Sequence, residues 1–430
     1  MTAQIETWDI VIIGAGPAGI AAAVTADSSG ARVLVIDDNP ALGGQIWRDG
    51  PHAKLPKVAQ TWRTALARCQ HVTVVNETRV ISLPASQKLL LEDPQRAWCV
   101  AWKKLILCTG ARELLLPFHG WTLPGVTGAG ALQALIKGGM PVAGERIVIA
   151  GSGPLLLAAA ATARMAGAKV VRIAEQASLA SLVRFAAQLA RWPSKRAQML
   201  SMSPRLLDAS YRSSAFVGAA HGAGEQHRVR AATIQYAHRT EEIACDRIAC
   251  GYGLVPNAQL GQAMGCALVA SAPYESPPLR VDQWGATSIS GVYAAGECTG
   301  IAGSEAALVA GQIAGYAATE SRDLAQALFP ERARWQAFGT LLARHFALNP
   351  ALRSLPNADT LVCRCEDVAC GELAAHTAWT PAKLATRCGM GACQGRICGA
   401  AAQALFDWSM PAPRPPFSPA RIGTMAHCTT

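Results

Sequence analysis

The sequence predicts an α/β protein in which one strand–loop–helix–strand unit occurs twice, followed by a short helical segment rich in cysteine. The first unit begins with the apolar run 9–13 and the second with the apolar run 146–150. Each run leads into a glycine-rich loop and an alanine-rich stretch, and a second apolar run follows. Short apolar runs of this kind predict buried strands of a parallel sheet, because helices cover both faces of such a sheet. The repeat therefore predicts two similar α/β domains in one chain.

Length and composition are consistent with this organisation. The chain has 430 residues, enough for two or three domains that each bury a core. The formal net charge of +10 comes from scattered basic residues, without a dense run or an aromatic-interleaved stripe. This pattern argues against a nucleic-acid-binding protein and favours an ordinary basic surface. A variant of this interpretation is that the charge helps to hold anionic dinucleotides or an acidic partner subunit.

The first residues and the cysteines indicate the compartment. The start of the chain, MTAQIETWDI, has no basic segment and no small-residue cleavage site. The longest uncharged runs, around 10–26 and 147–163, are interrupted by glycine and proline and make poor membrane spans. Six of the 14 cysteines lie between residues 363 and 398, which favours a metal centre in a reducing compartment over a disulfide scaffold. We therefore expect a cytoplasmic protein without a membrane span.

The first glycine-rich loop has the pattern of a dinucleotide-binding site. Gly14 permits a tight turn, Gly16 lets the backbone approach a pyrophosphate, and Gly19 allows the helix to pack closely on the strand. The following helix offers free N–H groups and its positive dipole end to phosphates. Asp37 follows the strand 32–36, where its carboxylate can accept hydrogen bonds from ribose hydroxyls. The predicted binding residues are Gly14, Gly16, Pro17, Ala18, Gly19 and Asp37.

A distant segment indicates which dinucleotide the first domain binds. The segment GVYAAGE, residues 291–297, combines a strand with Ala-Gly-Glu, and an uncharged helix begins near Glu305. Together with Thr109-Gly110-Ala111 and Gly43-Gly44-Gln45, it makes about the first 320 residues resemble the glutathione-reductase-like superfamily of FAD/NAD-dependent oxidoreductases. The resemblance implies two Rossmann-like domains, with an FAD domain interrupted by an NAD-like domain. It also implies FAD contacts from Gly44, Gln45, Thr109, Gly110, Gly296 and Glu297.

The second glycine-rich loop keeps only part of the pattern. Gly151 and Gly153 are present, and Glu175 follows the strand 169–173, where an acid suits NAD better than NADP. The third glycine is replaced by Leu156, whose side chain is expected to crowd the helix against the strand and to move the helix N-terminus. Gly151, Gly153 and Glu175 are therefore candidates for binding a second nucleotide, NAD or ATP. Because of Leu156 we predict a degenerate domain, a structural or adenine-nucleotide-holding remnant, in preference to a working NAD site.

Two kinds of chemistry find no support in the sequence. A disulfide reductase needs a pair of thiols near the flavin, but Gln45-Ile46-Trp47 follows Gly44 without a cysteine pair. The nine histidines are scattered and form no acid–base or nucleophilic motif. We therefore predict cofactor-binding residues but assign no catalytic side chain.

The cysteine-rich segment has the spacing of a thiolate-bound metal centre. Cys363 and Cys365 form one close pair, and Cys388, Cys393 and Cys398 follow in a glycine-containing stretch. A [2Fe-2S] cluster needs two thiolates on each iron, and glycine-rich backbone can wrap the inorganic sulfurs and donate N–H groups to them. Zinc is the alternative occupant, although zinc ribbons usually have C-x2-C at both ends, unlike the C-x-C and C-x4-C found here.

This segment resembles the bacterioferritin-associated-ferredoxin-like [2Fe-2S] domain, a small helical fold, in the variant attached to flavoprotein subunits. By that resemblance the cluster ligands are Cys363, Cys365, Cys393 and Cys398, with Cys388 as a fifth candidate. The chain as a whole resembles the α (A-type) subunit of heteromeric amine and imino-acid dehydrogenases. That group includes opine oxidases, D-hydroxyproline and L-proline dehydrogenases, and hydrogen cyanide synthase.

The resemblance implies an electron-transferring flavoprotein subunit. A separate flavin-containing β subunit, similar to D-amino-acid oxidase, would oxidise an opine, hydroxyproline, proline or glycine-type substrate, and a small ferredoxin-like γ subunit is often present. Electrons would pass through the [2Fe-2S] cluster and FAD to an acceptor such as a quinone. An NADH-dependent reductase of a ferredoxin or small acceptor is the main alternative, and a structural or redox-sensing scaffold is a third.

The expected domains follow from these motifs. Residues 1–114 and 272–325 form the predicted FAD-binding domain, and residues 115–271 form the NAD(P)-binding-like domain. Residues 326–410 contain helices and the [2Fe-2S] domain, and the proline-rich tail 411–430 is expected to be extended. Two interpretations of this tail are open: it docks onto a neighbouring chain, or it has no function.

Overall fold

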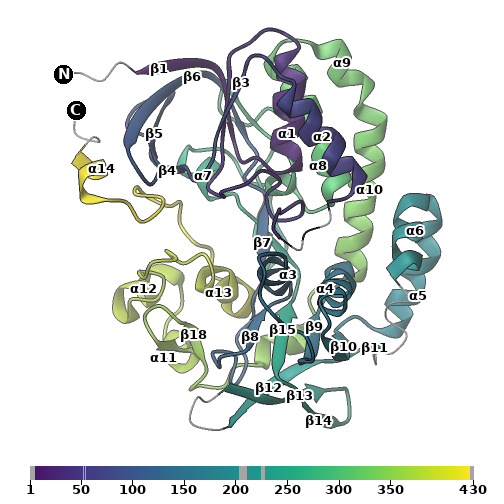
Figure 1. The fold of residues 1–430 in the computed structure, drawn as a ribbon. Helices are drawn as coiled ribbons and strands as arrows, with labels where there is room; N and C mark the ends of the chain where they lie inside the picture. The colour runs from purple at the N-terminus through teal and green to yellow at the C-terminus, as the bar shows by residue number, and fades with distance from the viewer. Residues whose placement is uncertain (1–4, 52, 54, 203–210, 224–227, 427–430) are drawn as a thin grey trace.

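The structure, a computed structural model, describes residues 5–51, 53, 55–202, 211–223 and 228–426. Within this part of the chain, two α/β domains lie one above the other, and a smaller domain lies beside the second (Figure 1). No helix among the described residues combines the length and the apolar character that crossing a membrane requires.

A seven-stranded sheet forms the centre of the first domain. Its strand order is β3-β2-β1-β6-β5-β4, and β17 pairs in parallel with the end of β6. The central strands β1, β2 and β6 are parallel, whereas β5 runs antiparallel to β6. The strands are β1 (Glu6–Ile13), β2 (Val33–Ile36), β3 (Val72–Val75), β4 (Arg79–Ser82), β5 (Lys88–Glu92), β6 (Ala97–Leu107) and β17 (Val292–Ala294).

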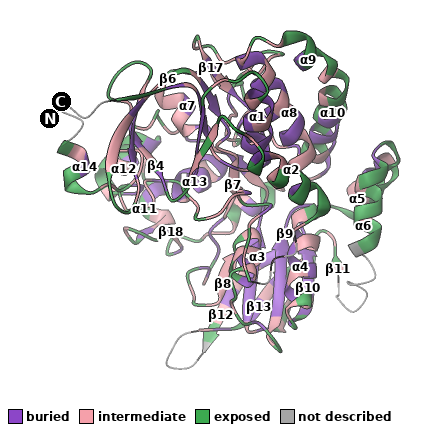
Figure 2. Ribbon diagram, turned by 45° about the horizontal axis from the view of Figure 1, so that its top comes forward, coloured by how far each residue is buried: buried purple, intermediate pink, exposed green. Residues whose placement is uncertain are grey.

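Alternating residues of β1 face two different hydrophobic cores. Ile10 and Ile12 pack with α1 and α8, whereas Val11 and Ile13 pack on the opposite face of the sheet. Figure 2 shows α1 and α8 as largely buried helices. Burial on both faces explains why the strand reads as a continuous apolar run. The helices of this domain are α1 (Pro17–Asp27), α2 (Lys57–Ala67), α7 (Gln259–Ala263), the 3-10 turn η3 (Glu297–Thr299), α8 (Ser304–Ala318) and α9 (Arg322–Ala327).

Helices α1 and α8 cross at very short distance because two glycines of α8 lie at the crossing. A methyl group on Gly311 would overlap the backbone of Ala18, and one on Gly315 would come within 2.6 Å of the carbonyl oxygen of Ala22. The close crossing fixes the start of α8, and the loop before it, next to the glycine-rich loop before α1.

The second domain repeats the parallel arrangement. Its five-stranded sheet has the order β11-β10-β9-β15-β8, and a three-stranded antiparallel sheet, β12-β13-β14, flanks it. The short antiparallel pair β7 (Ala111–Glu113) and β16 (Leu254–Pro256) lies between the domains. The remaining elements are β8 (Val126–Gly128), α3 (Ala129–Lys137), β9 (Arg146–Gly151), α4 (Pro154–Met165), β10 (Lys169–Glu175), α5 (Leu179–Gln188), η1 (Leu189–Arg191), α6 (Pro193–Met202), β11 (Tyr211–Arg212), β12 (Phe216–Ala223), β13 (Arg228–Gln235), β14 (Thr240–Ala244) and β15 (Arg247–Gly251).

The chain reaches the third domain along the long helix α10 (Phe329–His345), which runs beside both α/β domains (Figure 1). The third domain has a separate small core that includes Val362, Leu373 and Trp379. Its elements are η4 (Pro350–Ser354), β18 (Leu361–Cys363), β19 (Val368–Ala369), α11 (Cys370–Ala374), α12 (Trp379–Thr386) and α13 (Cys398–Phe406).

The proline-rich tail returns to the first domain of its own chain. Residues 411–421 form no helix or strand, whereas the short helix α14 (Ile422–Ala426) was not part of the extended tail predicted from the sequence. The N–H of Phe417 donates to the carbonyl oxygen of Ile81 at 2.8 Å, and that of Arg421 donates to the Glu92 carboxylate at 3.0 Å. The tail therefore rests on strands β4 and β5 of the same molecule.

Candidate functional site

The first glycine-rich loop follows β1 directly, and two of its positions admit only glycine. Gly14 has a φ of +102°, and a methyl group there would overlap the carbonyl oxygen of Cys108. A methyl group on Gly19 would overlap the carbonyl oxygen of Gly14. Helix α1 therefore approaches β1 as closely as the backbone allows. No side chain caps its N-terminus at Gly16, which leaves the N–H groups of its first turn available to an anion.

Asp37 follows β2 and lies against this loop. Its carboxylate accepts hydrogen bonds from the N–H of Ala15 at 2.5 Å and from the N–H of Asn39 at 2.8 Å. The side-chain amide of Asn39 donates a further bond at 2.7 Å. The predicted ribose-binding residue is therefore held beside the predicted phosphate-binding loop.

Two other segments meet the same loop, and at both contacts a side chain has no room. A methyl group on Gly44 would lie 3.1 Å from the Cα of Gly16, and one on Gly296 would lie 2.8 Å from the Cβ of Ala18. The result is a cradle of backbone groups around the N-terminus of α1, in which glycine leaves space for a dinucleotide phosphate. This geometry fits a bound FAD.

The remaining residues predicted for the first site come from segments beside the cradle. Thr109 follows β6 and donates its hydroxyl to the carbonyl oxygen of Asn257 at 2.6 Å. Glu297 begins the turn η3, and burial raises the pKa of its carboxyl group. Gln45 is exposed and accepts a hydrogen bond from Arg48 at 3.0 Å. Gly110 has open space around it.

The second glycine-rich loop follows a different backbone path. Gly151 has a φ of +141°, and a methyl group there would overlap the carbonyl oxygen of Gly251. Gly153 precedes α4 with a φ of +85°, whereas its counterpart Gly16 has a φ of −73°. The two loops thus differ at the residue that has to approach a pyrophosphate.

Leu156 takes the place of the third glycine and is completely buried. Its side chain belongs to a hydrophobic cluster with Leu132 and Ile136 of α3. In the first loop the corresponding position, Gly19, lies directly against the backbone of Gly14. Helix α4 is therefore held through side-chain packing, whereas α1 is held through direct contact with its strand.

Residues 346–349, which we call the covering segment, close the second loop. The ring of Phe346 lies 3.6 Å from the position of a methyl group on Gly153. The hydroxyl of Ser152 donates to the carbonyl oxygen of Phe346 at 3.1 Å. A backbone N–H of the same segment donates to the side chain of Gln176 at 2.6 Å. The protein's own chain thus packs against this loop at Ser152 and Gly153.

Glu175 binds the loop from the other side. Its carboxylate accepts hydrogen bonds from the N–H of Gly153 at 2.7 Å and from the N–H of Ala177 at 2.9 Å. Only 1% of the residue is exposed, and this burial raises its pKa to about 7 in spite of the backbone hydrogen bonds. The N–H of Gly153, which would face a pyrophosphate, is therefore already paired.

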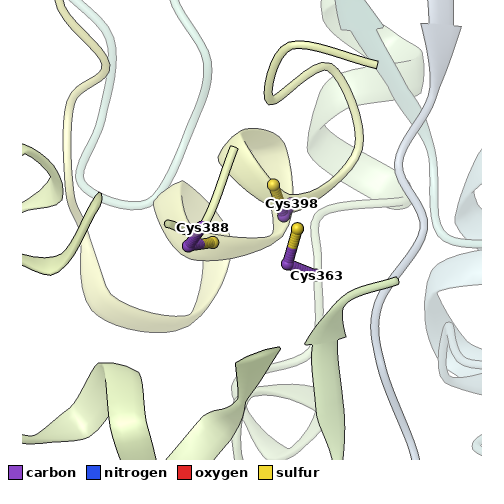
Figure 3. A group of neighbouring side chains, drawn as sticks. All are labelled: Cys363, Cys388 and Cys398. Carbon is purple, nitrogen blue, oxygen red and sulfur yellow. The ribbon is translucent and has the colours of Figure 1, made fainter. Parts of the chain in front are cut away.

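Three cysteines of the third domain point toward one another (Figure 3). Cys363 ends β18, Cys388 follows α12, and Cys398 begins α13. Their sulfur atoms lie within 4.8 Å of one another, and all three residues are buried. Two of them are predicted ligands, and Cys388 is the fifth candidate of the sequence analysis.

The other two predicted ligands adjoin this group. The exposed Cys365 forms a side-chain hydrogen bond with Cys393, and Cys393 forms another with Cys398. These contacts lower the pKa of Cys393 to about 4, first because the Cys398 thiol donates to it and also because the N–H groups of Ile397 and Gly395 do. The structure thus brings together all four predicted ligands and the fifth candidate.

The donor set fits a metal centre bound by thiolates. The five sulfur atoms come from three separate segments, and backbone N–H groups from the loop 393–398 reach the Cys393 sulfur. A methyl group on Gly391 would overlap the Cβ of Cys365, so glycine there is what lets the two cysteine segments meet. N–H groups directed at ligand sulfurs are typical of such centres.

Two residues that the sequence analysis did not select connect the cysteine loop to the first site. Nε of Arg112 donates to the carbonyl oxygen of Arg396, in the loop 393–398, at 2.8 Å. Another nitrogen of the same guanidinium donates to the side chain of Asn257 at 2.8 Å, and Asn257 donates to the carbonyl oxygen of Thr109 at 2.9 Å. These partners are 284 and 145 residues away from Arg112, so local sequence gives no signal for them.

Comparisons with known proteins identify the family to which the chain belongs. Residues 8–314 match the family model of the pyridine nucleotide-disulphide oxidoreductases, and the chain belongs to this family. Membership implies FAD as a cofactor, and the cradle around α1 fits that group.

Similar proteins of known function show to which group within this family the chain belongs. The chain is 32% identical to the A-type subunit of the opine oxidase of Rhizobium meliloti (strain 1021), over 98% of this chain and 99% of that protein. It is 30% identical to the HcnB subunit of the hydrogen cyanide synthase of Pseudomonas protegens, over 90% of this chain and 89% of that protein. The chain thus belongs to the group of oxidoreductases that contains these subunits, which confirms the resemblance stated from the sequence.

A solved structure extends the likeness of fold to the whole chain. The L-proline dehydrogenase from P. horikoshii superimposes with a TM-score of 0.68, over 98% of this chain and 80% of that chain, at 18% identity. The predicted fold class, α/β with two Rossmann-like domains, is confirmed.

Proposed function

We propose that this chain is the electron-transferring subunit of a heteromeric dehydrogenase that oxidises an amine or imino acid. Its relatives in opine oxidase and hydrogen cyanide synthase are both named as subunits, which supports an assembly of several chains. In this proposal a flavin-containing β subunit, similar to D-amino-acid oxidase, oxidises an opine, hydroxyproline, proline or glycine-type substrate. A small ferredoxin-like γ subunit completes the complex, and a quinone is a suitable acceptor. We expect it in the cytoplasm, a reducing compartment in which thiolate ligands persist.

Each cofactor has a defined set of residues in this proposal. FAD would lie with its pyrophosphate on the loop from Gly14 to Gly19 and its ribose at Asp37. A [2Fe-2S] cluster would take Cys363, Cys365, Cys393 and Cys398, with Cys388 beside it. FAD exchanges two electrons with organic partners, and a [2Fe-2S] cluster exchanges one at a time.

The observation that carries the proposal is the direct connection between the cysteine loop and the first site. Hydrogen bonds link the loop 393–398 to Thr109 by way of Arg112 and Asn257. Two predicted cluster ligands, Cys393 and Cys398, lie at the ends of that loop. Thr109 belongs to the segment Thr109-Gly110-Ala111, which is predicted to contact FAD and which we call the flavin segment. A relay between two centres needs such proximity.

The covering segment argues against the alternative, an NADH-dependent reductase. That function requires a dinucleotide on the second loop, where Phe346 lies over Gly153 and Glu175 is paired with its N–H. Both contacts disfavour a nucleotide on this loop.

The test uses the full chain, purified anaerobically with its FAD and mixed rapidly with NADH. We expect about two iron and two sulfide ions per chain and no rapid bleaching of the flavin band by NADH. When a flavin-containing β subunit of the proposed type is present together with an amine or imino-acid substrate, the flavin should be reduced. Cys398→Ser should lose the iron, whereas Cys370→Ser, in the same domain but outside the sulfur group, should keep it. Rapid bleaching by NADH would establish the reductase instead.

A further inference from the structure

We propose that Arg112 is the positioning residue that fixes the cysteine loop against the flavin segment and sets the charge between the two centres. This inference rests on the proposed function for its redox part. Its geometric part rests only on the contacts of Arg112.

The position of Arg112 in the chain places it between the two sites. It lies on β7, three residues after Thr109, and β7 pairs with β16 so that Arg112 is opposite Val255. Its side chain is only partly exposed. It reaches the loop 393–398 of the third domain.

The guanidinium group holds two partners in different directions. Nε donates to the carbonyl oxygen of Arg396, and a terminal nitrogen donates to the side chain of Asn257, each at 2.8 Å. Gln259 offers a third acceptor at 3.0 and 3.1 Å once its side-chain amide is turned so that the oxygen faces Arg112. Asn257 is fixed to the flavin segment, since its own N–H donates to Gly110 at 2.9 Å and its side chain donates to Thr109 at 2.9 Å.

The contact to the cysteine loop is made to its backbone. The side chain of Arg396 instead donates to the carbonyl oxygen of Phe417, in the tail, at 2.7 Å. The path of the loop, rather than the identity of residue 396, is therefore what Arg112 fixes. The loop is held on one side by Arg112 and on the other by the tail, and both contacts lead to the first domain.

Lysine cannot reproduce this arrangement. A guanidinium presents its donors as a rigid planar fork, whereas an ammonium is a point charge on a flexible stem. Arg112→Lys would keep the positive charge and lose the simultaneous contacts. Arg112→Gln would lose the charge as well. The two variants therefore separate a role in positioning from a role in electrostatics.

The charge has its own expected effect. Reduction of a thiolate-bound cluster adds negative charge, and a nearby buried cation stabilises the reduced form. Removal of the cation in Arg112→Gln should therefore lower the midpoint potential of the cluster. Arg112→Lys should leave that potential nearer the value of the wild type.

The experiment compares the full-length holoprotein with Arg112→Lys and Arg112→Gln. Arg191→Lys and Arg191→Gln, at an exposed arginine of η1, are matched controls. The readouts are flavin and iron content, the cluster midpoint potential, the rate of electron exchange between flavin and cluster after a reducing pulse, and hydrogen exchange of the amides of residues 393–398.

We expect hydrogen exchange of these amides to rise by about ten-fold or more in both Arg112 variants, because each loses a charge-assisted hydrogen bond to the loop. Electron exchange should slow by about ten-fold or more, and only Arg112→Gln should lower the potential. The Arg191 variants should match the wild type. Unchanged hydrogen exchange in both Arg112 variants would overturn the inference.

The outcomes also separate this inference from the proposed function. A protein without iron, in which the Arg112 variants still release the loop, would refute the relay and keep the positioning role. A protein with its cluster, in which both Arg112 variants keep the wild-type loop protection, potential and exchange rate, would refute the role of Arg112 and keep the relay.

Discussion

The two glycine-rich loops of this protein share a sequence pattern, yet the fold treats them in opposite ways. Around the first loop, the neighbouring segments contribute glycines, Gly44 and Gly296, and leave a cradle. Around the second loop, a neighbouring segment contributes the ring of Phe346 and fills the approach to Gly153. The comparison teaches that a strand–glycine–helix unit becomes a ligand site only where its tertiary neighbours leave it open.

The two units also differ at the third residue of the helix that follows each loop. Gly19 lets α1 touch the backbone before it, whereas Leu156 anchors α4 in a hydrophobic cluster. One position therefore serves close backbone contact in the first domain and core packing in the second. Substitutions there should have different consequences in the two domains.

The largest effect on flavin binding is expected for Gly19→Ala. The added methyl group would overlap the carbonyl oxygen of Gly14 and push α1 away from β1. Overpacking of this kind costs about 1–3 kcal/mol or more in stability, and we expect the purified variant to have lost its FAD. Flavin absorbance after gel filtration and thermal unfolding measure both effects. Gly423→Ala, where a methyl group meets open space, is the control. A variant that retained its flavin fully would show that the first loop does not need this close contact.

Leu156→Ala should have a smaller effect on flavin binding, although its effect on stability is comparable. Truncation of a completely buried leucine typically costs about 2–5 kcal/mol, depending on how far the cavity collapses. Because Leu156 lies in the core of the second domain, the flavin content should not change. Denaturant unfolding and flavin absorbance test this pair of expectations. Loss of flavin from this variant would contradict the separation of the two loops.

The third prediction concerns the pH dependence of stability and leaves flavin binding unchanged. The pKa of Glu175 is raised from its usual 4.5 to about 7 in the folded protein. The folded state therefore binds more protons between these values, so the stabilisation from Glu175 is present below pH 4.5 and is lost as the pH rises through 7. Its full size is on the order of 3 kcal/mol. Glu175→Gln should flatten the profile of unfolding free energy between pH 5 and 7.5. Parallel profiles for variant and wild type would refute the raised pKa.

Local patterns predicted the strands well. The apolar runs 9–13, 32–36, 146–150 and 169–173 correspond to β1, β2, β9 and β10, which is confirmed within a few residues. Strands buried on both faces need continuous apolar sequence, so the signal is contained in a few neighbouring residues. The metal centre in the cysteine segment could be predicted for a similar reason, because the spacing of its cysteines places several thiols within one small domain.

Contacts between distant segments could not be predicted in this way. The composition of the tail did not predict the helix α14, and only the fold shows that the tail rests on Ile81 and Glu92 of its own chain. Nothing in the sequence around Phe346 indicates that it covers Gly153. The role of Arg112 likewise could not be predicted, because nothing in the sequence distinguishes it from the other arginines.

The sequence by itself determined the two glycine loops, the acids beside them and the clustered cysteines, because each motif depends on residues close together in the chain. Only the tertiary structure decided which loop is open, where the tail lies, and how the cysteine loop meets the flavin segment. The physical reason is that these features depend on packing and hydrogen bonds between residues that are far apart in the chain, and any single segment leaves such contacts undetermined.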